Sequence, residues 1–302
     1  MKNRFEQLLA QLDRVILGKQ HELRLAICCM LARGHLLLED LPGMGKTTLS
    51  QGLAQIFGMT HNRVQFTSDM LPADITGALV YEQQSGEFRF HRGPIFCQVL
   101  LADELNRATP KAQSALLQAM EETQVSVDGE NHRLPTPFFV IATQNPSHQS
   151  GTYPLPESQL DRFLMRLSLG YPDAKAERLL LKGEHGRAAL ENLSAVLSAE
   201  EFVAMQETVP EVHLSDSLLD YVQRLTAASR NPQNCDVGLS PRAAMYLVRA
   251  SQAWAMMIGR DHVLPEDIQS VFPAVAGHRL VGHGATGDAS AARLLAEVSV
   301  IT

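Results

Sequence analysis

The sequence predicts an α/β fold in which a parallel-sheet core with β-hairpin insertions is followed by an all-α domain. Short apolar runs, typical of buried parallel strands, alternate with helical patterns up to about residue 170. Two pairs of alternating segments, each joined by a turn that contains glycine, interrupt this order and predict hairpins. After residue 172 only helical spacing remains, which predicts a separate helical domain.

The composition bounds the class of protein. A chain of 302 residues with 45% hydrophobic and 20% charged residues is typical of a soluble globular protein of about two domains. The formal net charge of −7 argues against nucleic acid as a partner. The four cysteines include no C-x-x-C pair, so we expect buried free thiols in a reducing compartment. We see no signal peptide and no run of roughly 20 apolar residues, so we expect a cytoplasmic protein without a membrane segment.

Each predicted element follows from its local spacing. Apolar or alternating runs predict strands at residues 36–38, 63–67, 95–102, 138–142 and 166–169. Helical spacing predicts helices at 4–16, 19–32, 47–57, 110–123 and 160–163 in the first part of the chain. It predicts further helices at 176–182, 199–208, 216–228, 241–257, 265–275 and 289–298. The hairpins are expected at 78–90 and 124–134.

A glycine-bearing loop lies between the first predicted strand and the next helix, at residues 40–48 (DLPGMGKTT). Gly43 and Gly45 let the backbone turn its N–H groups toward phosphate oxygens, and the helix N-terminus adds its positive dipole. Lys46 would reach the β- and γ-phosphates of a nucleotide, and the Thr47 hydroxyl would hold Mg²⁺. The predicted binding residues are Pro42, Gly43, Met44, Gly45, Lys46, Thr47 and Thr48.

The loop departs from the pattern G-x-x-x-x-G-K-[ST] at one place, because Asp40 stands where the first glycine is expected. A carboxylate that faced the phosphates would repel them. The Asp40 side chain is therefore expected to turn away from the nucleotide. A bare G-K-T occurs in many proteins, so this loop needs support from the rest of the chain.

Polar residues end two of the predicted strands. Because ligands bind at the carboxyl ends of parallel strands, Asp103 is expected to face the phosphates and to hold Mg²⁺ through its water shell. Glu104 is placed to polarise a water for attack on the γ-phosphate. Asn145 ends the next buried strand at the same edge, where its amide would orient that water or sense the γ-phosphate. An acidic turn is the alternative for the first two residues, and an ordinary turn is the alternative for Asn145.

Two arginines are candidates for contact with phosphate. Arg162 could reach a neighbouring subunit's nucleotide and stabilise transition-state charge, or it could form a local ion pair with Asp161. Arg242 lies in the first turn of a predicted helix, after a Ser240 cap and Pro241. A cation there opposes the helix dipole, which suggests a functional target such as phosphate. A solvated surface residue is the alternative.

Several segments, in this order, carry a resemblance to a known family. They are LPGMGKT at 41–47, LLADELNRA at 100–108, FVIATQNP at 139–146, GTYPLPE at 151–157 and QLDRF at 159–163. Together they resemble the MoxR family of AAA+ ATPases. The match runs from about residue 15 to 170, and Ser-Pro-Arg at 240–242 continues it. The resemblance implies a P-loop AAA+ core followed by an all-α lid.

The resemblance implies ATP and Mg²⁺ as cofactors and a ring, usually a hexamer, with ATP bound between subunits. The matched positions are Lys46 and Thr47 in Walker A, Asp103 and Glu104 in Walker B, Asn145 as sensor 1, Arg162 as the arginine finger and Arg242 as the sensor 2 arginine. Both arginines are implied to act on a neighbour's nucleotide.

We predict a nucleotide-binding core at 1–172, a linker at 173–190 and a helical lid at 191–302. Within the core, the hairpins at about 73–93 and 124–134 match the family's helix-2 insert and pre-sensor hairpin, which face the ring pore or a partner. Relatives are chaperone-like ATPases, often with VWA-domain partners. The resemblance therefore implies remodelling, assembly or maturation of client proteins.

Two other functions stay open. One is an AAA+ nucleic-acid motor, because helicases of this class carry the same hairpin insertions. The hairpin cations Arg89, Arg92 and Arg133 are nearly balanced by neighbouring carboxylates, which weighs against it. The other is a nucleotide-switched scaffold, which would bind partners according to nucleotide state with little turnover.

Overall fold

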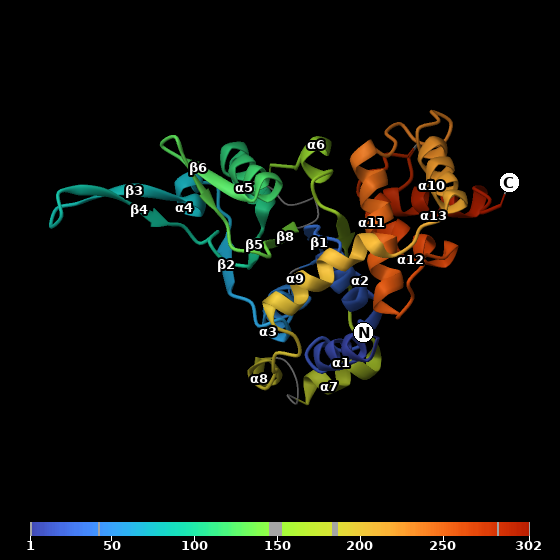
Figure 1. The fold of residues 1–302 in the computed structure, drawn as a ribbon, viewed down its shortest axis with the longest axis horizontal. Helices are drawn as coiled ribbons and strands as arrows, with labels where there is room; N and C mark the ends of the chain where they lie inside the picture. The colour runs from blue at the N-terminus through green and yellow to red at the C-terminus, as the bar shows by residue number, and fades with distance from the viewer. Residues whose placement is uncertain (1, 42, 145–152, 183–186, 283, 302) are drawn as a thin grey trace.

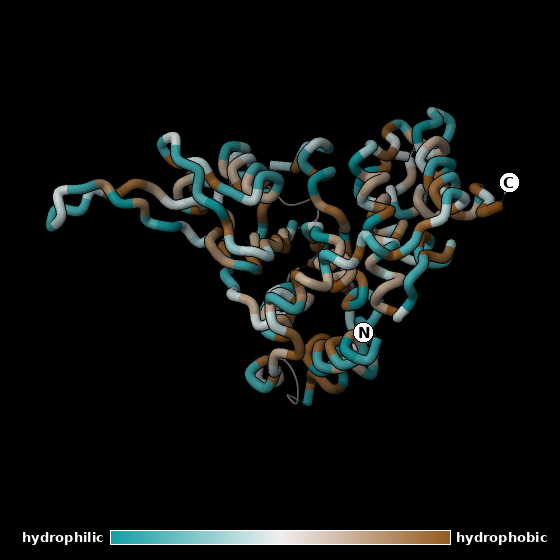
Figure 2. Tube along the Cα trace, viewed as in Figure 1, coloured by the Kyte–Doolittle hydropathy of each residue, from teal (hydrophilic) through white to brown (hydrophobic). Residues whose placement is uncertain are grey.

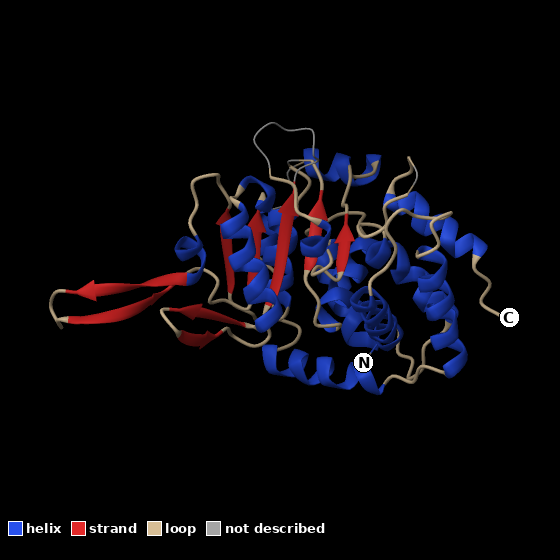
Figure 3. Cartoon of the chain, turned by 90° about the horizontal axis from the view of Figure 1, so that it is seen from above, coloured by secondary structure: helices blue, strands red, loops and turns tan. Residues whose placement is uncertain are grey.

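The computed structural model describes residues 2–41, 43–144, 153–182, 187–282 and 284–301. Its core is a parallel sheet with the strand order β2-β5-β8-β1-β9 (Figure 3). The strands are β1 Leu36–Glu39, β2 His61–Gln65, β5 Val99–Asp103, β8 Phe139–Gln144 and β9 Met165–Leu167. This sheet, its hairpin insertions and the helices that follow confirm the predicted fold class.

The register of the strands brings their carboxyl ends to one edge of the sheet. Gln65 of β2 lies beside Asp103 of β5, and Glu39 of β1 lies beside Gln144 of β8. Each of these polar residues ends its strand, so the loops that follow gather at this carboxyl edge. At the opposite, amino edge, β1 and β9 begin side by side. The two edges therefore present different loops and different chemistry.

The side chains of β1 alternate between two buried clusters, as expected for a central strand covered on both faces. Leu36 and Leu38 belong to the first cluster, together with residues of the three N-terminal helices, and Leu37 belongs to the second, together with residues of the helix that follows β5. The helices of this part of the chain are α1 Lys2–Asp13, α2 Gln20–Leu31, α3 Lys46–Ile56, α4 Pro72–Thr76, α5 Pro110–Glu122 and α6 Glu157–Leu160.

The C-terminal part contains helices and no strand among its described residues (Figure 1). The helices are α7 Ala174–Leu181, α8 Arg187–Glu191, α9 Ala199–Thr208, α10 Asp216–Ser229, α11 Pro241–Met257, α12 Pro265–Ala276 and α13 Gly287–Glu297. A short 3₁₀ turn, η2 Val209–Glu211, follows α9, and another, η1 Leu105–Arg107, follows β5 in the core. In the part of the chain that the structure describes, no helix has the length and apolar character needed to cross a membrane.

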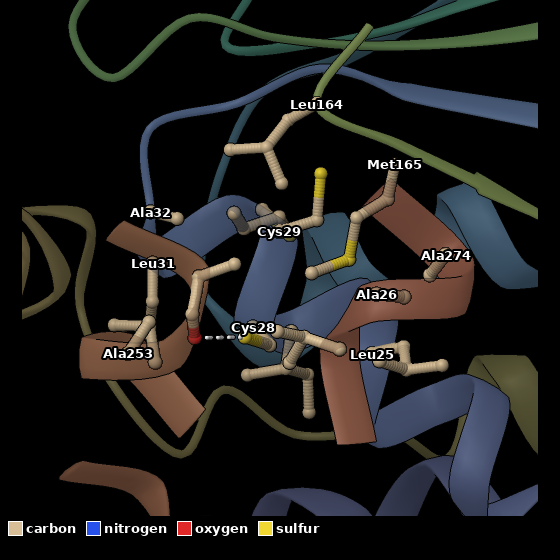
Figure 4. Close-up of a cluster of buried hydrophobic side chains, with 14 of the residues drawn as sticks. Leu25, Ala26, Cys28, Cys29, Leu31, Ala32, Leu164, Met165, Ala253 and Ala274 are labelled. Atoms are coloured by element: carbon tan, nitrogen blue, oxygen red, sulfur yellow. Dashed lines mark hydrogen bonds between the residues drawn. The ribbon is translucent and has the colours of Figure 1, made fainter. Parts of the chain in front are cut away.

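Helix α2 joins the sheet to the C-terminal helices. Figure 4 shows Cys28 and Cys29 of α2 between Met165 of β9 and Ala253 of α11. The Cys28 thiol donates to the carbonyl of Ala250 at 3.2 Å, and burial raises its pKa well above the ordinary value. All four cysteines are buried and free, as the sequence predicts. One hydrophobic cluster therefore connects the sheet face, α2 and the C-terminal helices.

Two antiparallel hairpins project from the sheet, as predicted. They are β3 Gly77–Glu82 with β4 Glu87–Arg92, and β6 Gln124–Val127 with β7 Glu130–Arg133. The β3–β4 hairpin forms a long arm with an apolar stretch along it (Figure 2). The rings of Tyr81 and Phe88, which are 53% and 68% exposed, lie 5.3 Å apart on this arm. Phe90 stacks on His132 at 4.0 Å, so the two hairpins touch.

The structure differs from the sequence prediction in several local elements. The helix expected at 160–163 lies at Glu157–Leu160, so Arg162 follows the helix instead of lying in it. The short helix α4 was not predicted; Pro72 opens it, and Asp74 accepts a hydrogen bond from the Leu71 N–H at 2.8 Å. The segment predicted as a linker contains α7, close to the helix predicted at 176–182, and begins α8, which was not predicted. The boundaries at 172 and 190 stay predictions.

Phe202 of α9 tests the packing of the C-terminal part on the core. Its ring is fully buried, 4.3 Å from that of Phe57, which follows α3. Phe202→Ala is expected to lower the free energy of unfolding by about 3–5 kcal/mol, because it removes a buried ring and leaves a cavity. Phe88→Ala, at an exposed ring, is the matched control and is expected to cost less than about 1 kcal/mol. Denaturant titration followed by circular dichroism measures both; equal losses would contradict this packing.

Candidate functional site

The predicted phosphate loop lies at the carboxyl edge, between β1 and α3. Gly45 caps α3 with φ +84°, and Gly43 has φ +85°, a region that favours glycine. A Cβ at Gly43 would meet nothing within 4 Å, so the constraint there comes from the backbone and not from crowding. Thr47 and Thr48 lie half-buried in the first turn of α3, and Met44 is half-buried beside them. Pro42 lies outside the described residues.

Lys46 is the first residue of α3 and its side chain is buried. Its ammonium donates to the carbonyl of Asp40 at 2.9 Å, so it folds back over the loop. Burial lowers the pKa of Lys46, and the nearby charges of Asp103, Asp40 and Glu104 partly offset this effect. The ammonium group thus lies among acidic side chains at the edge where a phosphate would bind.

Asp40 turns away from the loop, as predicted. Its carboxylate accepts from the Ser168 hydroxyl at 2.8 Å and from the N–H groups of Leu169 at 2.5 Å and Gly170 at 3.0 Å. It is 5% exposed. The residue that breaks the glycine pattern therefore anchors the phosphate loop to the segment after β9.

Asp103 is buried at the end of β5 and both its carboxylate oxygens are hydrogen-bonded. One oxygen accepts from the Thr143 hydroxyl at 2.6 Å, and the other pairs with Arg63 of β2 at 2.7 Å. The sequence did not single out either partner. Threonine at the end of β8 was visible in the motif, but its target 40 residues away was not.

Glu104 has a backbone conformation that is rare for a residue with a side chain, with φ +57°. Its N–H donates to the Thr143 hydroxyl at 2.8 Å, so one threonine orients both acidic residues. The Glu104 carboxylate accepts from Gln65 at 2.9 Å and pairs with Arg107 at 3.0 Å. Unusual backbone of this kind concentrates at functional sites.

This donor set fits a magnesium nucleotide. Backbone N–H groups at a helix N-terminus, a lysine ammonium, a threonine hydroxyl and two carboxylates meet at one edge, and hard oxygen ligands are those that Mg²⁺ prefers. The residues that would hold the ion are Thr47 and Asp103. The predicted sensor, Asn145, lies outside the described residues, which end in this region at Gln144.

Arg162 and Arg242 lie together at the amino edge, away from the phosphate loop. Leu164 donates to the carbonyl of His35, just before β1 begins, and Arg162 lies two residues earlier. The length of β1 therefore separates Arg162 from the loop, roughly 15 Å at about 3.3 Å per residue. Both arginines line a cavity of about 570 Å³ at this edge.

The partners of the two arginines differ from both sequence alternatives. Glu121, near the end of α5, pairs with Arg162 at 3.1 Å and with Arg242 at 2.5 Å. The local pair of Arg162 with Asp161 does not form, because Asp161 pairs with the buried Arg279 at 2.7 Å. Arg242 stays partly exposed to solvent, with 37% of its side chain accessible, and shares Glu121 with Arg162.

The comparisons with known proteins place this geometry in a family. Residues 35–165 match the model of the ATPase family associated with various cellular activities (AAA), and residues 227–298 match the AAA lid domain. The chain is 37% identical to Chaperone MoxR1 of Mycobacterium tuberculosis, over 98% of this chain and 79% of the relative. It is 44% identical to the uncharacterized protein YeaC of Bacillus subtilis, over 90% of this chain and 85% of that one.

The chain belongs to the MoxR family of AAA+ ATPases. A crystal structure of a candidate ATPase from Cytophaga hutchinsonii has the same fold, with a TM-score of 0.89 and 34% identity. It matches 100% of this chain and 96% of that one. The fold of that ATPase therefore matches the described residues of this chain, including those between the two family models.

For this MoxR-family chain we expect Asp40 to stabilise the loop by anchoring it. Asp40→Gly restores the glycine of the pattern but removes three hydrogen bonds to a charged group, so we expect a loss of stability of about 2 kcal/mol or more. We expect weaker nucleotide binding as well. Asp40→Asn retains one acceptor oxygen and should lose less.

Denaturant titration and binding of a fluorescent ATP analogue measure these effects. Unchanged stability together with tighter nucleotide binding in Asp40→Gly would show that the carboxylate is not an anchor.

Proposed function

We propose that this chain is an ATP-hydrolysing, chaperone-like ATPase that works as an oligomeric ring, usually a hexamer. In this proposal it uses turnover to remodel, assemble or mature partner proteins. Membership of the AAA+ family supports the ATPase activity, and a relative named as a chaperone supports the action on proteins. The buried free cysteines fit a reducing compartment such as the cytoplasm.

The main support for this proposal is a distance. The two arginines lie far from the phosphate loop of the same chain. Arg162 and Arg242 lie at the amino edge, whereas Lys46 and Asp103 lie at the carboxyl edge. An arginine side chain cannot span the length of the sheet between them. A second subunit that brings its amino edge to this carboxyl edge would complete the site, and successive subunits joined in this way can close a ring.

Within the completed site the chain's own residues have distinct roles. Lys46 and the loop N–H groups bind the phosphates, and Thr47 and Asp103 hold Mg²⁺, which neutralises phosphate charge when bound. Glu104 accepts a proton from the attacking water and so polarises it. Asn145 orients that water, and the neighbour's Arg162 and Arg242 stabilise the charge that develops on the transferred phosphate.

The hairpins provide the contact with other proteins in this proposal, and a VWA-domain protein is the partner class we expect. Exposed aromatic rings at Tyr81 and Phe88 suit an apolar protein surface. For the nucleic-acid alternative, the pairing of Arg89 with Glu82 across the arm at 3.3 Å reduces the positive charge that the arm offers to phosphates. A nucleotide-switched scaffold would bind the same partners without appreciable turnover.

Glu104→Gln tests the chemistry. It keeps the size of the side chain but removes the group that accepts a proton, so we expect steady-state ATP turnover to fall about 100-fold or more. ATP binding should persist, because the phosphate loop is unchanged. Glu130→Gln, at an exposed hairpin residue, is the matched control. Undiminished turnover with ATP bound would refute the role of Glu104.

Mixed rings test the shared site. Lys46→Ala and Arg162→Ala should each abolish turnover alone, and their mixture should recover part of it, because some interfaces combine an intact loop with intact arginines. Arg133→Ala, an exposed hairpin arginine, is the control for loss of a cation. Mixed rings that form, as shown by subunit exchange between labelled proteins, but recover no turnover would rule out the arrangement in trans.

A further inference from the structure

We propose that Glu121 is a positioning residue that joins Arg162 and Arg242 into a single clamp for the phosphates of the neighbouring subunit. The proposal rests on the shared site described above and extends it. None of the sequence motifs assigns a role to Glu121, which lies near the end of α5. Its two carboxylate oxygens bind one arginine each, at 3.1 Å and 2.5 Å.

The backbones that carry the two arginines are already tied together. Asp161, beside Arg162, accepts from the hydroxyl of Ser240 at 2.9 Å, and Ser240 caps α11, in which Arg242 is the second residue. The buried Arg279 donates to the Asp161 carboxylate at 2.7 Å and to the carbonyls of Asp161 and Phe163. The loop before β9 and the start of α11 therefore form one rigid support.

Glu121 fixes the side chains on this support. Two guanidinium groups held close together repel each other, and a shared carboxylate offsets that repulsion by attracting both, while leaving both partly exposed. Arg162 has a second anchor, since its guanidinium donates to the carbonyl of Leu117 at 2.9 Å. Arg242 has no second contact of comparable length among the described residues; Asp161 lies 3.9 Å away.

Holding both cations in advance lowers the cost of stabilising transition-state charge, because the donors need not reorganise when the phosphate arrives. The cavity beside them has a volume of about 570 Å³ and is also lined by Arg33, Arg249 and Glu207, with Glu207 3.9 Å from Arg33. Arg162 and Arg242 thus lie beside an open space into which phosphate groups of another subunit could enter. Glu121 then acts through the arginines and not on the nucleotide of its own subunit.

Glu121→Gln is the sharpest test, because glutamine offers one acceptor oxygen and turns a donor toward the second arginine. We expect kcat to fall about tenfold, as for the loss of a hydrogen bond to a charged group, with KM for ATP unchanged. Glu122→Gln, one residue along α5, is the matched control; that carboxylate accepts from Gln118. We expect no change in its turnover.

Mixing variant subunits shows which half of the interface Glu121 belongs to. Glu121→Gln mixed with Lys46→Ala should recover turnover to above that of either variant alone, because interfaces form that have an intact loop and an intact clamp. Glu121→Gln mixed with Arg162→Ala should recover none, because both changes damage the same half of the interface. Recovery in the second mixture and not in the first would overturn the proposal.

Two measurements distinguish a failure of the role of Glu121 from a failure of the shared site on which it rests. Lys46→Ala mixed with Arg162→Ala must recover turnover first, since failure there removes the shared site itself. Light scattering then measures ring assembly of Glu121→Gln. Unchanged assembly with lower kcat supports the clamp, whereas loss of assembly, or turnover equal to or above that of the unaltered protein, overturns it.

Discussion

The common direction of the strands is the constraint on which the rest of this structure depends. Since every strand of the sheet runs parallel, all carboxyl ends meet at one edge and all amino ends at the other. The phosphate loop and the acidic pair follow strands, so they share the first edge. Arg162 precedes β9, so it must lie at the other. Within one subunit the phosphate loop and Arg162 therefore lie at opposite edges of the sheet.

Hydrogen bonds across the strand ends set the chemistry of the carboxyl edge. Thr143 orients Asp103 and Glu104 together, and Arg63 neutralises part of the acidic charge. Asp40 fixes the loop itself by binding the segment after β9. The orientation of each of these buried side chains is fixed by its hydrogen-bond partners. The side chains at the carboxyl edge therefore form a connected network in which each holds its neighbours in place.

The amino edge is built from the two parts of the chain together. Arg242 and Arg279 come from the C-terminal helices, whereas Glu121 and Asp161 come from the core. The continuous hydrophobic cluster around α2 holds these parts against each other (Figure 4). A movement of the C-terminal helices would therefore shift Arg242 relative to Arg162.

The sequence alone determined the features whose causes are local. Helix spacing predicted α9 and α11 with the bounds that the structure has, and glycine spacing located the loop at Gly43 and Gly45. The helix expected at 160–163 was wrong by a few residues, since helix ends depend on capping contacts as well as on spacing.

Only the tertiary structure decided the pairings between distant residues. The carboxylate of Asp40 binds backbone about 130 residues away, and Glu121 meets an arginine 121 residues further along the chain. No local pattern encodes such contacts, because they depend on which strand ends and helices the completed sheet brings together. The sequence thus predicted candidate residues for the chemistry, and the folded sheet decided which of them share an edge.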